Sequence, residues 1–189
     1  LMRYDSKAQG GMVSYPVSSV NTDRAALIST LNSFSPGGNT PLSETLYEAY
    51  LYFAGGGVHY GNTSYVGNVL TPSVPASRVG GLASSNTYRT PMQYACQKNF
   101  VVFLTDGLPT SDVDADALIK GLPNEAALGG ACDAGAAGTS GLCLGALAQY
   151  MFNADLNPSL AGQQNVQSYF IGFGDDPSRR AQAYFRGVG

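Results

Sequence analysis

The chain has 189 residues, the usual size of one domain, and its apolar fraction of 44% is enough to build a hydrophobic core. Its net charge of −3 provides no basic face, which gives a nucleic-acid partner little support. No apolar run reaches the roughly 18 residues that a membrane span needs. Charged residues make up only 12% of the chain, so uncharged polar residues must keep the surface soluble, a composition that mildly favours an exported protein.

The start of the chain predicts a short antiparallel hairpin. Residues 1–4 (LMRY) and 12–17 (MVSYPV) are typical of strands, and the turn sequence SKAQGG separates them. The chain thus opens inside a predicted strand, and it closes with AYFRGVG directly after a predicted helix. We therefore expect it to be an internal piece of a longer protein.

Two helices are predicted next, over residues 21–34 and 40–54. Thr22 and Thr40 are the candidate N-caps, and glycines from Gly55 onward end the second helix. Apolar residues recur at spacings of three and four in both segments, which predicts one buried face on each helix. In the first helix this face consists of Leu27, Leu31 and Phe34. In the second it consists of Leu42, Leu46, Ala49, Tyr50 and Phe53.

Residues 55–97 form a predicted insertion with a different composition. Gly, Ser, Asn, Thr, Tyr and Pro dominate this segment, and no hydrophobic period is sustained. A loop of this length in a compact domain is usually functional or poorly ordered. His59, the only histidine, lies here, and a lone loop histidine is more often an ordinary polar residue than a ligand.

The second half alternates strands and helices. Residues 99–105 are an almost continuous apolar run, typical of a strand of a parallel sheet that is covered on both faces. Helices are predicted over 113–122, 142–156 and 176–187, and a second apolar strand over 165–174. The core face of the middle helix is predicted to contain Leu144, Leu147, Tyr150 and Met151. The alternation predicts an α/β fold, with an open, mostly parallel sheet and helices on both faces.

Three cysteines are present. Cys132 and Cys143 flank a Gly/Ala/Ser-rich loop, and a disulfide between them would hold that loop and suit an oxidising compartment. The alternative is two unrelated buried thiols. If the bridge forms, Cys96 is left over, either free or paired outside this piece.

Acidic residues follow the first apolar strand of the second half. Ligands of open α/β sheets bind beyond the carboxyl ends of the strands, where Asp106 and Thr40 are expected to converge and provide hard oxygen ligands for a cation. The alternating acids Asp112, Asp114 and Asp116 are similar to the start of a calcium loop. Because the later glycine and glutamate of such a loop are missing, a solvated acidic loop leading into a helix is the favoured interpretation.

The segments GGNTPLSETLYEA and FVVFLTDGLPTSD resemble the second and third motifs of von Willebrand factor A domains. That resemblance implies a Rossmann-like fold and a metal-ion-dependent adhesion site, with Thr40 and Asp106 among the ligands of Mg²⁺ or Ca²⁺. The family's Asp-x-Ser-x-Ser loop is absent, and residues 1–4 resemble its second strand. The first, central strand would therefore lie upstream of residue 1 and pair between residues 1–5 and 99–105. We expect a partial domain over residues 1–189 that binds metal only when the upstream loop is present.

A closer resemblance, to the PilY/PilC family of type IV pilus biogenesis factors and tip adhesins, covers nearly the whole chain. It is carried by GNTPLSETLYEAYLYF, the Gly/Tyr/Ser insertion, CQKNFVVFLTDGLPTSD, LAQYMFNADL and QNVQSYFIGFG. The resemblance implies export through the periplasm to the pilus tip or outer membrane surface. It also implies minor pilins and a host or abiotic surface as partners.

These resemblances imply a non-enzymatic binding and mechanical module that supports pilus biogenesis, surface attachment and surface sensing. The alternative is a structural assembly subunit that packs against minor pilins and has a vestigial metal site. An enzyme is not expected, because the sequence has no nucleophile elbow, no cysteine–histidine arrangement and no Gly-rich phosphate loop with a lysine. A metal-dependent hydrolase remains a third, minor hypothesis.

Overall fold

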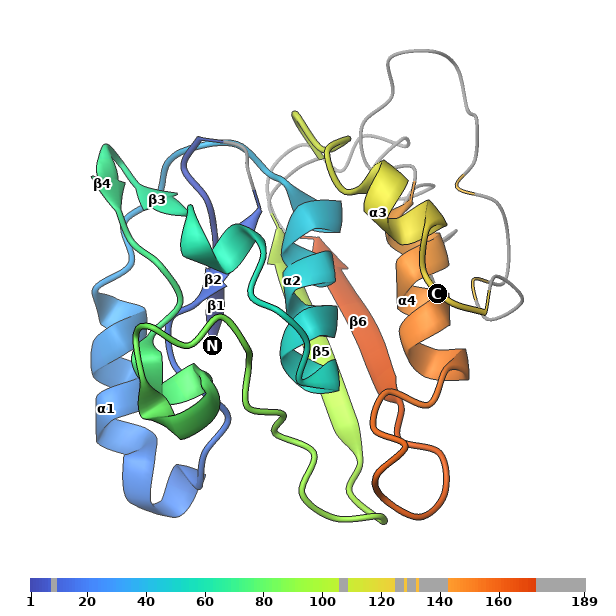
Figure 1. Cartoon of the computed structure of the whole chain (residues 1–189). Helices are drawn as coiled ribbons and strands as arrows, with labels where there is room; N and C mark the ends of the chain where they lie inside the picture. Colours follow the sequence, from blue (N-terminus) through green and yellow to red (C-terminus); the bar gives the residue numbers. More distant parts are fainter. Residues whose placement is uncertain (8–9, 106–108, 125–127, 129–131, 133–142, 173–189) are drawn as a thin grey trace.

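The structure is a computed structural model that describes residues 1–7, 10–105, 109–124, 128, 132 and 143–172. It is a mixed α/β fold, and the described residues form three two-stranded sheets (Figure 1). The antiparallel sheets pair β1 (Met2–Tyr4) with β2 (Gly11–Val13) and β3 (Tyr65–Val66) with β4 (Val69–Leu70). The third sheet pairs β5 (Asn99–Thr105) with β6 (Val166–Gly172) in parallel.

The predicted hairpin at the start of the chain is confirmed. Met2 faces Val13 and Tyr4 faces Gly11 in the β1–β2 register. The turn closes where the Asp5 N–H donates a 2.7 Å hydrogen bond to the carbonyl of Gly10. Gly10 has a φ of +94°, and a Cβ there would lie 2.5 Å from the side chain of Tyr60, so both backbone conformation and space favour glycine.

The predicted parallel pairing of the two apolar strands is also confirmed, from Asn99 opposite Val166 to Thr105 opposite Gly172. The prediction that β5 is covered on both faces does not hold for the described part of the chain. Phe103 is buried, whereas Phe100, Val102 and Leu104 on the opposite face are each about half exposed. The three small sheets are separate, and they do not form one open Rossmann-like sheet among the described residues.

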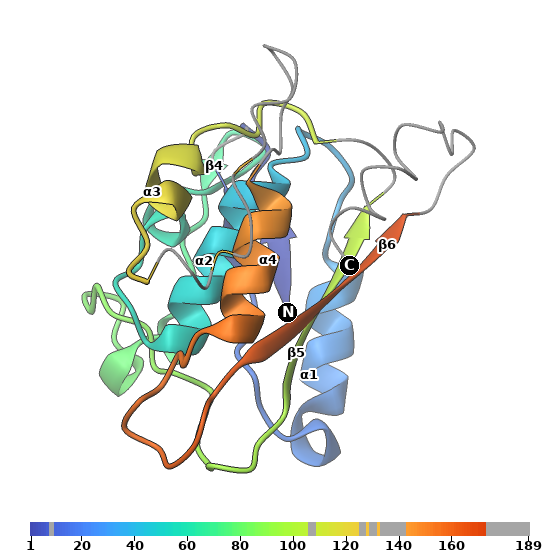
Figure 2. The ribbon, with the colours of Figure 1, turned by 90° about the vertical axis from the view of Figure 1, so that its right-hand side faces the viewer.

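The helices lie in two layers. Figure 2 shows α2 (Leu42–Ala54) and α4 (Leu144–Asn153) on one side of β5 and β6, with α1 (Val20–Asn32) on the other. The short α3 (Asp116–Lys120) lies above α4 (Figure 1). None of the described helices is long and apolar enough to cross a membrane.

Helices α2 and α4 supply much of the hydrophobic core. The predicted core face of α4 is confirmed, since Leu144, Leu147, Tyr150 and Met151 are all buried. The face predicted for α2 is buried at Leu42, Leu46, Ala49 and Phe53, and Tyr50 is half buried. Gly55 ends α2 in the left-handed conformation with a φ of 67°, which explains the glycine at that position.

Three details of the predicted helices are wrong. Helix α1 begins at Val20 with Ser19 as its N-cap, earlier than the predicted cap Thr22. Its predicted apolar face is not buried, because Leu31 and Phe34 border a hollow and not a packed core. The N-cap of α2 is Pro41, one residue after the predicted cap Thr40.

The predicted insertion is a packed segment with short elements of its own. These are η1 (Tyr60–Asn62), β3, β4, η2 (Pro75–Ser77) and η3 (Val79–Gly81). Arg78 is buried within it and donates hydrogen bonds to the carbonyls of Ser73 (3.2 Å) and Ser85 (3.0 Å) and to the Asn62 side chain (2.9 Å). Polar residues therefore order this segment without a hydrophobic period, through hydrogen bonds to its own backbone.

Candidate functional site

The candidate site lies at the end of the domain where β5 and β6 terminate. Both strands point their carboxyl ends toward the top of Figure 1, and α2 begins at the same end. We call this end, formed by residues 38–44 and 109–116, the rim. The rim is the position at which open α/β sheets bind ligands.

Thr40 and Thr110 join the two segments of the rim. The Thr40 N–H donates a 3.1 Å hydrogen bond to the Thr110 hydroxyl, and the Thr110 N–H donates a 3.3 Å bond to the Thr40 carbonyl. Thr40 therefore lies against the loop that follows β5. Asp106, the other predicted metal ligand, directly follows β5 in the sequence and lies outside the described residues.

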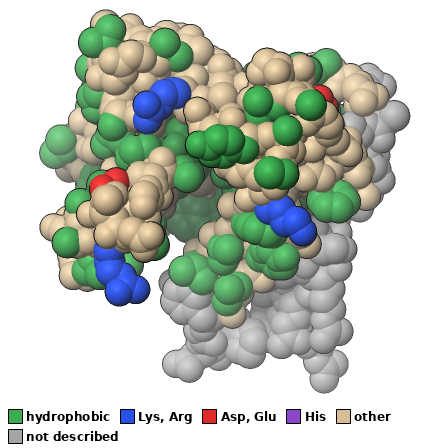
Figure 3. All heavy atoms as spheres, turned by 90° about the horizontal axis from the view of Figure 1, so that it is seen from below, with side chains coloured by type: hydrophobic (Ala, Val, Ile, Leu, Met, Phe, Trp, Pro, Cys, Tyr) green, Lys and Arg blue, Asp and Glu red, His purple; other side chains and the backbone are tan. Residues whose placement is uncertain are grey.

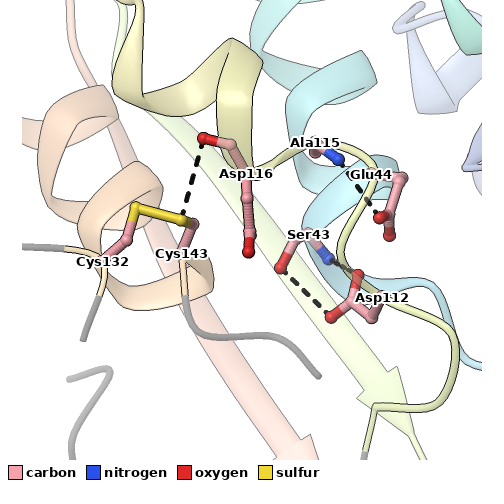
Figure 4. The surroundings of a disulfide bond; sticks show 7 residues. All are labelled: Ser43, Glu44, Asp112, Ala115, Asp116, Cys132 and Cys143. Atoms are coloured by element: carbon pink, nitrogen blue, oxygen red, sulfur yellow. Dashed lines mark hydrogen bonds between the residues drawn. A yellow bond between two sulfur atoms is a disulfide. The ribbon is translucent and has the colours of Figure 1, made fainter. Parts of the chain in front are cut away.

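Ser43 and Asp112 make a second connection across the rim. The Ser43 N–H donates to Asp112 Oδ1 (2.7 Å) and the Ser43 hydroxyl donates to Asp112 Oδ2 (3.1 Å), as Figure 4 shows. Asp112 is fully buried, so the predicted solvated acidic loop is wrong at this residue. The physical reason is that the first turn of α2 offers the carboxylate hydrogen-bond donors that replace water.

Glu44 forms the third connection. Its Oε1 atom accepts hydrogen bonds from the N–H groups of Asp114 (2.8 Å) and Ala115 (3.3 Å). Glu44 is fully buried, and its Oε2 atom has no hydrogen-bond donor in the structure. The side chain of Asp114 is exposed and that of Asp116 is partly exposed, so of the three loop acids only Asp112 is buried.

Two acids of the rim, Asp112 and Asp116, have raised pKa values. Burial raises the pKa of Asp112 to about 9, helped by the neighbouring Glu44 carboxylate and opposed by the hydrogen bonds from Ser43. Burial also raises the pKa of Asp116, and the nearby Lys120 opposes that rise. Burial and the neighbouring carboxylate thus both favour the protonated form of Asp112.

The described residues contain no cluster of the usual metal-binding side chains. Among them, no three or more His, Cys, Asp or Glu side chains are grouped so as to hold a metal ion. Both carboxylate oxygens of Asp112 already accept hydrogen bonds from Ser43, which does not fit a calcium loop. Thr40 alone supplies one hydroxyl of the kind that an Mg²⁺ or Ca²⁺ site uses.

A disulfide borders the rim and confirms the predicted pairing. The sulfurs of Cys132 and Cys143 are 2.06 Å apart, and Figure 4 shows the bridge beside Asp116 at the start of α4. The Cys143 sulfur lies 4.0 Å from the backbone carbonyl oxygen of Asp116. Cys96 is free and exposed.

A second feature is a cavity of about 470 Å³ between the hairpin and the parallel pair. Residues 1–4 of the hairpin line one wall and residues 100–104 of β5 line another, with Leu31 and Phe34 beyond them. Among the described residues that line it, Arg3 carries the one charged side chain. The Tyr4 hydroxyl reaches across to donate a 3.1 Å hydrogen bond to the carbonyl of Leu104. Figure 3 shows hydrophobic side chains around and within a hollow when the molecule is seen from below.

The sequence interpretation missed Ser43 and Glu44. Both lie in the first turn of α2, next to the predicted metal ligand Thr40, and Glu44 interrupts no apolar spacing, so it resembled an ordinary exposed helix residue. Glu44 lies in the first turn of a helix that begins at the predicted ligand-binding edge, and this position could have indicated a role at the rim.

Comparisons with family models, with curated proteins and with solved structures find no match to this chain.

Proposed function

We propose that the chain is a von Willebrand A-like binding and mechanical module of a type IV pilus tip-associated adhesin. The observation that carries this proposal is the pair of hydrogen bonds between Thr40 and Thr110. They bring the TPLSE segment against the loop after the TDG turn, at the carboxyl end of a parallel strand pair. An adhesion site built from those two motifs requires that they meet there.

The cavity between β1 and β5 supports the finer proposal of an open Rossmann-like sheet. An additional strand in this cavity would lie between the hairpin and the parallel pair and would join the two sheets. Its neighbours would be apolar on both sides, with Ala49 and Phe53 of α2 on one side and Leu31 and Phe34 on the other. A buried strand of a parallel sheet has such surroundings.

The proposed adhesion site includes a divalent cation. Thr40 and Asp106 would be two of its ligands, together with an Asp-x-Ser-x-Ser loop supplied from outside these residues. When bound, the Mg²⁺ or Ca²⁺ ion offers a coordination position to an acidic group of a host or abiotic surface ligand. The chain's own contribution is to hold Thr40 against the loop after β5, through the hydrogen bonds between Thr40 and Thr110.

A second candidate is a structural subunit that primes or caps the pilus by packing against minor pilins. The half-exposed apolar side chains Phe100, Val102 and Leu104 favour it, because such a row is suited to a protein contact. In this case the metal site has no role in adhesion. Either function places the protein outside the cell, at the pilus tip or outer membrane surface after export through the periplasm.

The test compares the Asp106→Ala and Thr40→Ala variants of the full-length protein with the wild type. Calorimetric titration with Mg²⁺ and Ca²⁺ should show binding that both variants lose, and bacterial attachment should fall while pili still assemble. Asp114→Ala, which removes an exposed acid from the same loop, is the matched control and should bind metal normally. Unchanged metal binding or unchanged attachment in both variants would reject the adhesion site and favour the structural subunit.

A further inference from the structure

The connection between Glu44 and Asp112 is a feature that the proposed function does not use. Both side chains are fully buried, one on α2 and one in the loop after β5. Every other carboxylate oxygen of the two residues accepts a hydrogen bond, and Glu44 Oε2 alone has no donor. A buried acceptor without a donor costs free energy, and a proton on a neighbouring carboxyl would supply the donor.

Asp112 is the group that can supply this proton. A protonated carboxyl has one O–H donor, whereas two ionised carboxylates in contact have none and repel each other. Two neighbouring carboxyls in a buried site favour the retention of one proton between them, and Glu44 is a neighbour of Asp112. We propose that Glu44 and Asp112 share one proton and form a pH-sensitive clamp that holds the loop after β5 against the first turn of α2.

The charged and titratable groups around the clamp are consistent with a single negative charge. Helix α2 contributes the Ser43 donors beside the clamp, and the loop after β5 contributes Asp114 and Asp116. Lys120 of α3 attracts Asp116. Burial, and then the nearby charges of Glu44 and Asp114, raise the pKa of Tyr60 of η1. The negative charges thus outnumber the one lysine, which favours retention of the shared proton.

The direction of the pH response follows from the raised pKa. In the unfolded chain Asp112 loses its proton near its ordinary value of 3.8, whereas in the folded chain it keeps the proton up to about 9. The contribution of the clamp to stability is therefore complete below about 4 and is lost as the pH rises through about 9. Above that value two adjacent charges force the loop away from α2.

The first experiment is a carboxyl ¹³C NMR titration of the chain, with the Asp112 resonance assigned by its absence from the Asp112→Asn spectrum. We expect this resonance to titrate near pH 9, and the backbone amides of Asp114 and Ala115 to lose their protection from hydrogen exchange over the same range. In Glu44→Gln the side-chain amide can donate to Asp112, so its resonance should titrate at a lower pH. Titration of the wild-type resonance below pH 5 would overturn the proposal.

The second experiment measures urea unfolding between pH 5 and 8. Because the folded chain keeps a proton on Asp112 that the unfolded chain loses, the wild-type folding equilibrium constant should fall as the pH rises, by up to about tenfold per pH unit. Asp112→Asn keeps an acceptor for the Ser43 N–H and gains an amide donor for Glu44, so it should fold and lose this slope. Asp114→Asn, the matched control, should keep the wild-type slope. An unchanged slope in Asp112→Asn would contradict the clamp, and if that variant does not fold, the wild-type titration decides alone.

Discussion

Tyr88 donates a 2.6 Å hydrogen bond through its hydroxyl to Oε1 of Glu48, a residue 40 positions earlier in the chain. Both residues are almost completely buried. Ser73 Oγ lies 2.7 Å from the same hydroxyl and accepts a 2.9 Å hydrogen bond from the N–H of Val13. One buried polar network therefore joins the insertion to α2 and β2, and it explains how a segment without hydrophobic periodicity is held in place.

Tyr88→Phe should lower the free energy of unfolding by about 1–3 kcal/mol, because it leaves a buried carboxylate without one of its donors. Urea unfolding at constant pH measures the change. Tyr94→Phe is the control, since Tyr94 is 70% exposed and its change should be within error. Equal effects of the two substitutions would show that the network does not anchor the insertion.

Gly61→Ala should disrupt the same network by overpacking. A Cβ at Gly61 would lie 2.3 Å from both the Ser73 and the Tyr88 side-chain oxygens. Displacing them should cost about 1–3 kcal/mol. At Gly57 the nearest atom to a new Cβ is 3.7 Å away, so Gly57→Ala is the matched control in a thermal or urea melt. A variant at Gly61 as stable as the control would mean that the network can relax around a methyl group.

Leu147→Ala should be among the most destabilising single substitutions, with a loss of about 2–5 kcal/mol in urea unfolding. Leu147 is fully buried on the face of α4 that packs toward α2 and β6, and truncation would leave a cavity there. Phe152→Ala on the same helix should cost much less, because Phe152 is half exposed. The reverse order would contradict the orientation of α4.

Reduction of the Cys132–Cys143 disulfide should lower stability by roughly 3 kcal/mol in the loop-entropy description. The bridge closes a loop with a sequence separation of 11 residues beside the rim. Urea unfolding with and without a reductant measures the loss, and Cys132→Ser should abolish the difference. Cys96→Ser should leave it unchanged, because Cys96 is free and exposed. A response to reductant that survives Cys132→Ser would point to another pairing.

Local patterns in the sequence determined the main elements of this protein. The apolar runs of β5 and β6, the faces of α2 and α4 and the Cys132–Cys143 bridge all depend on residues close in sequence or on apolar periodicity. These features are predictable because each follows from a local pattern: continuous apolar runs favour strands, apolar residues at helical spacing favour one buried helix face, and two cysteines that flank a short loop can close it. The final helix predicted over residues 176–187 lies outside the described residues and stays a prediction.

Only the tertiary structure decided which polar residues are buried and which are exposed. Asp112 and Asp114 are two positions apart in one acidic loop, yet one is fully buried and the other is exposed. The difference arises because Ser43, distant in sequence, brings two hydrogen-bond donors to Asp112. A carboxylate can be buried where donors or a shared proton replace water, and donors 69 residues away in the chain leave no local pattern in the sequence.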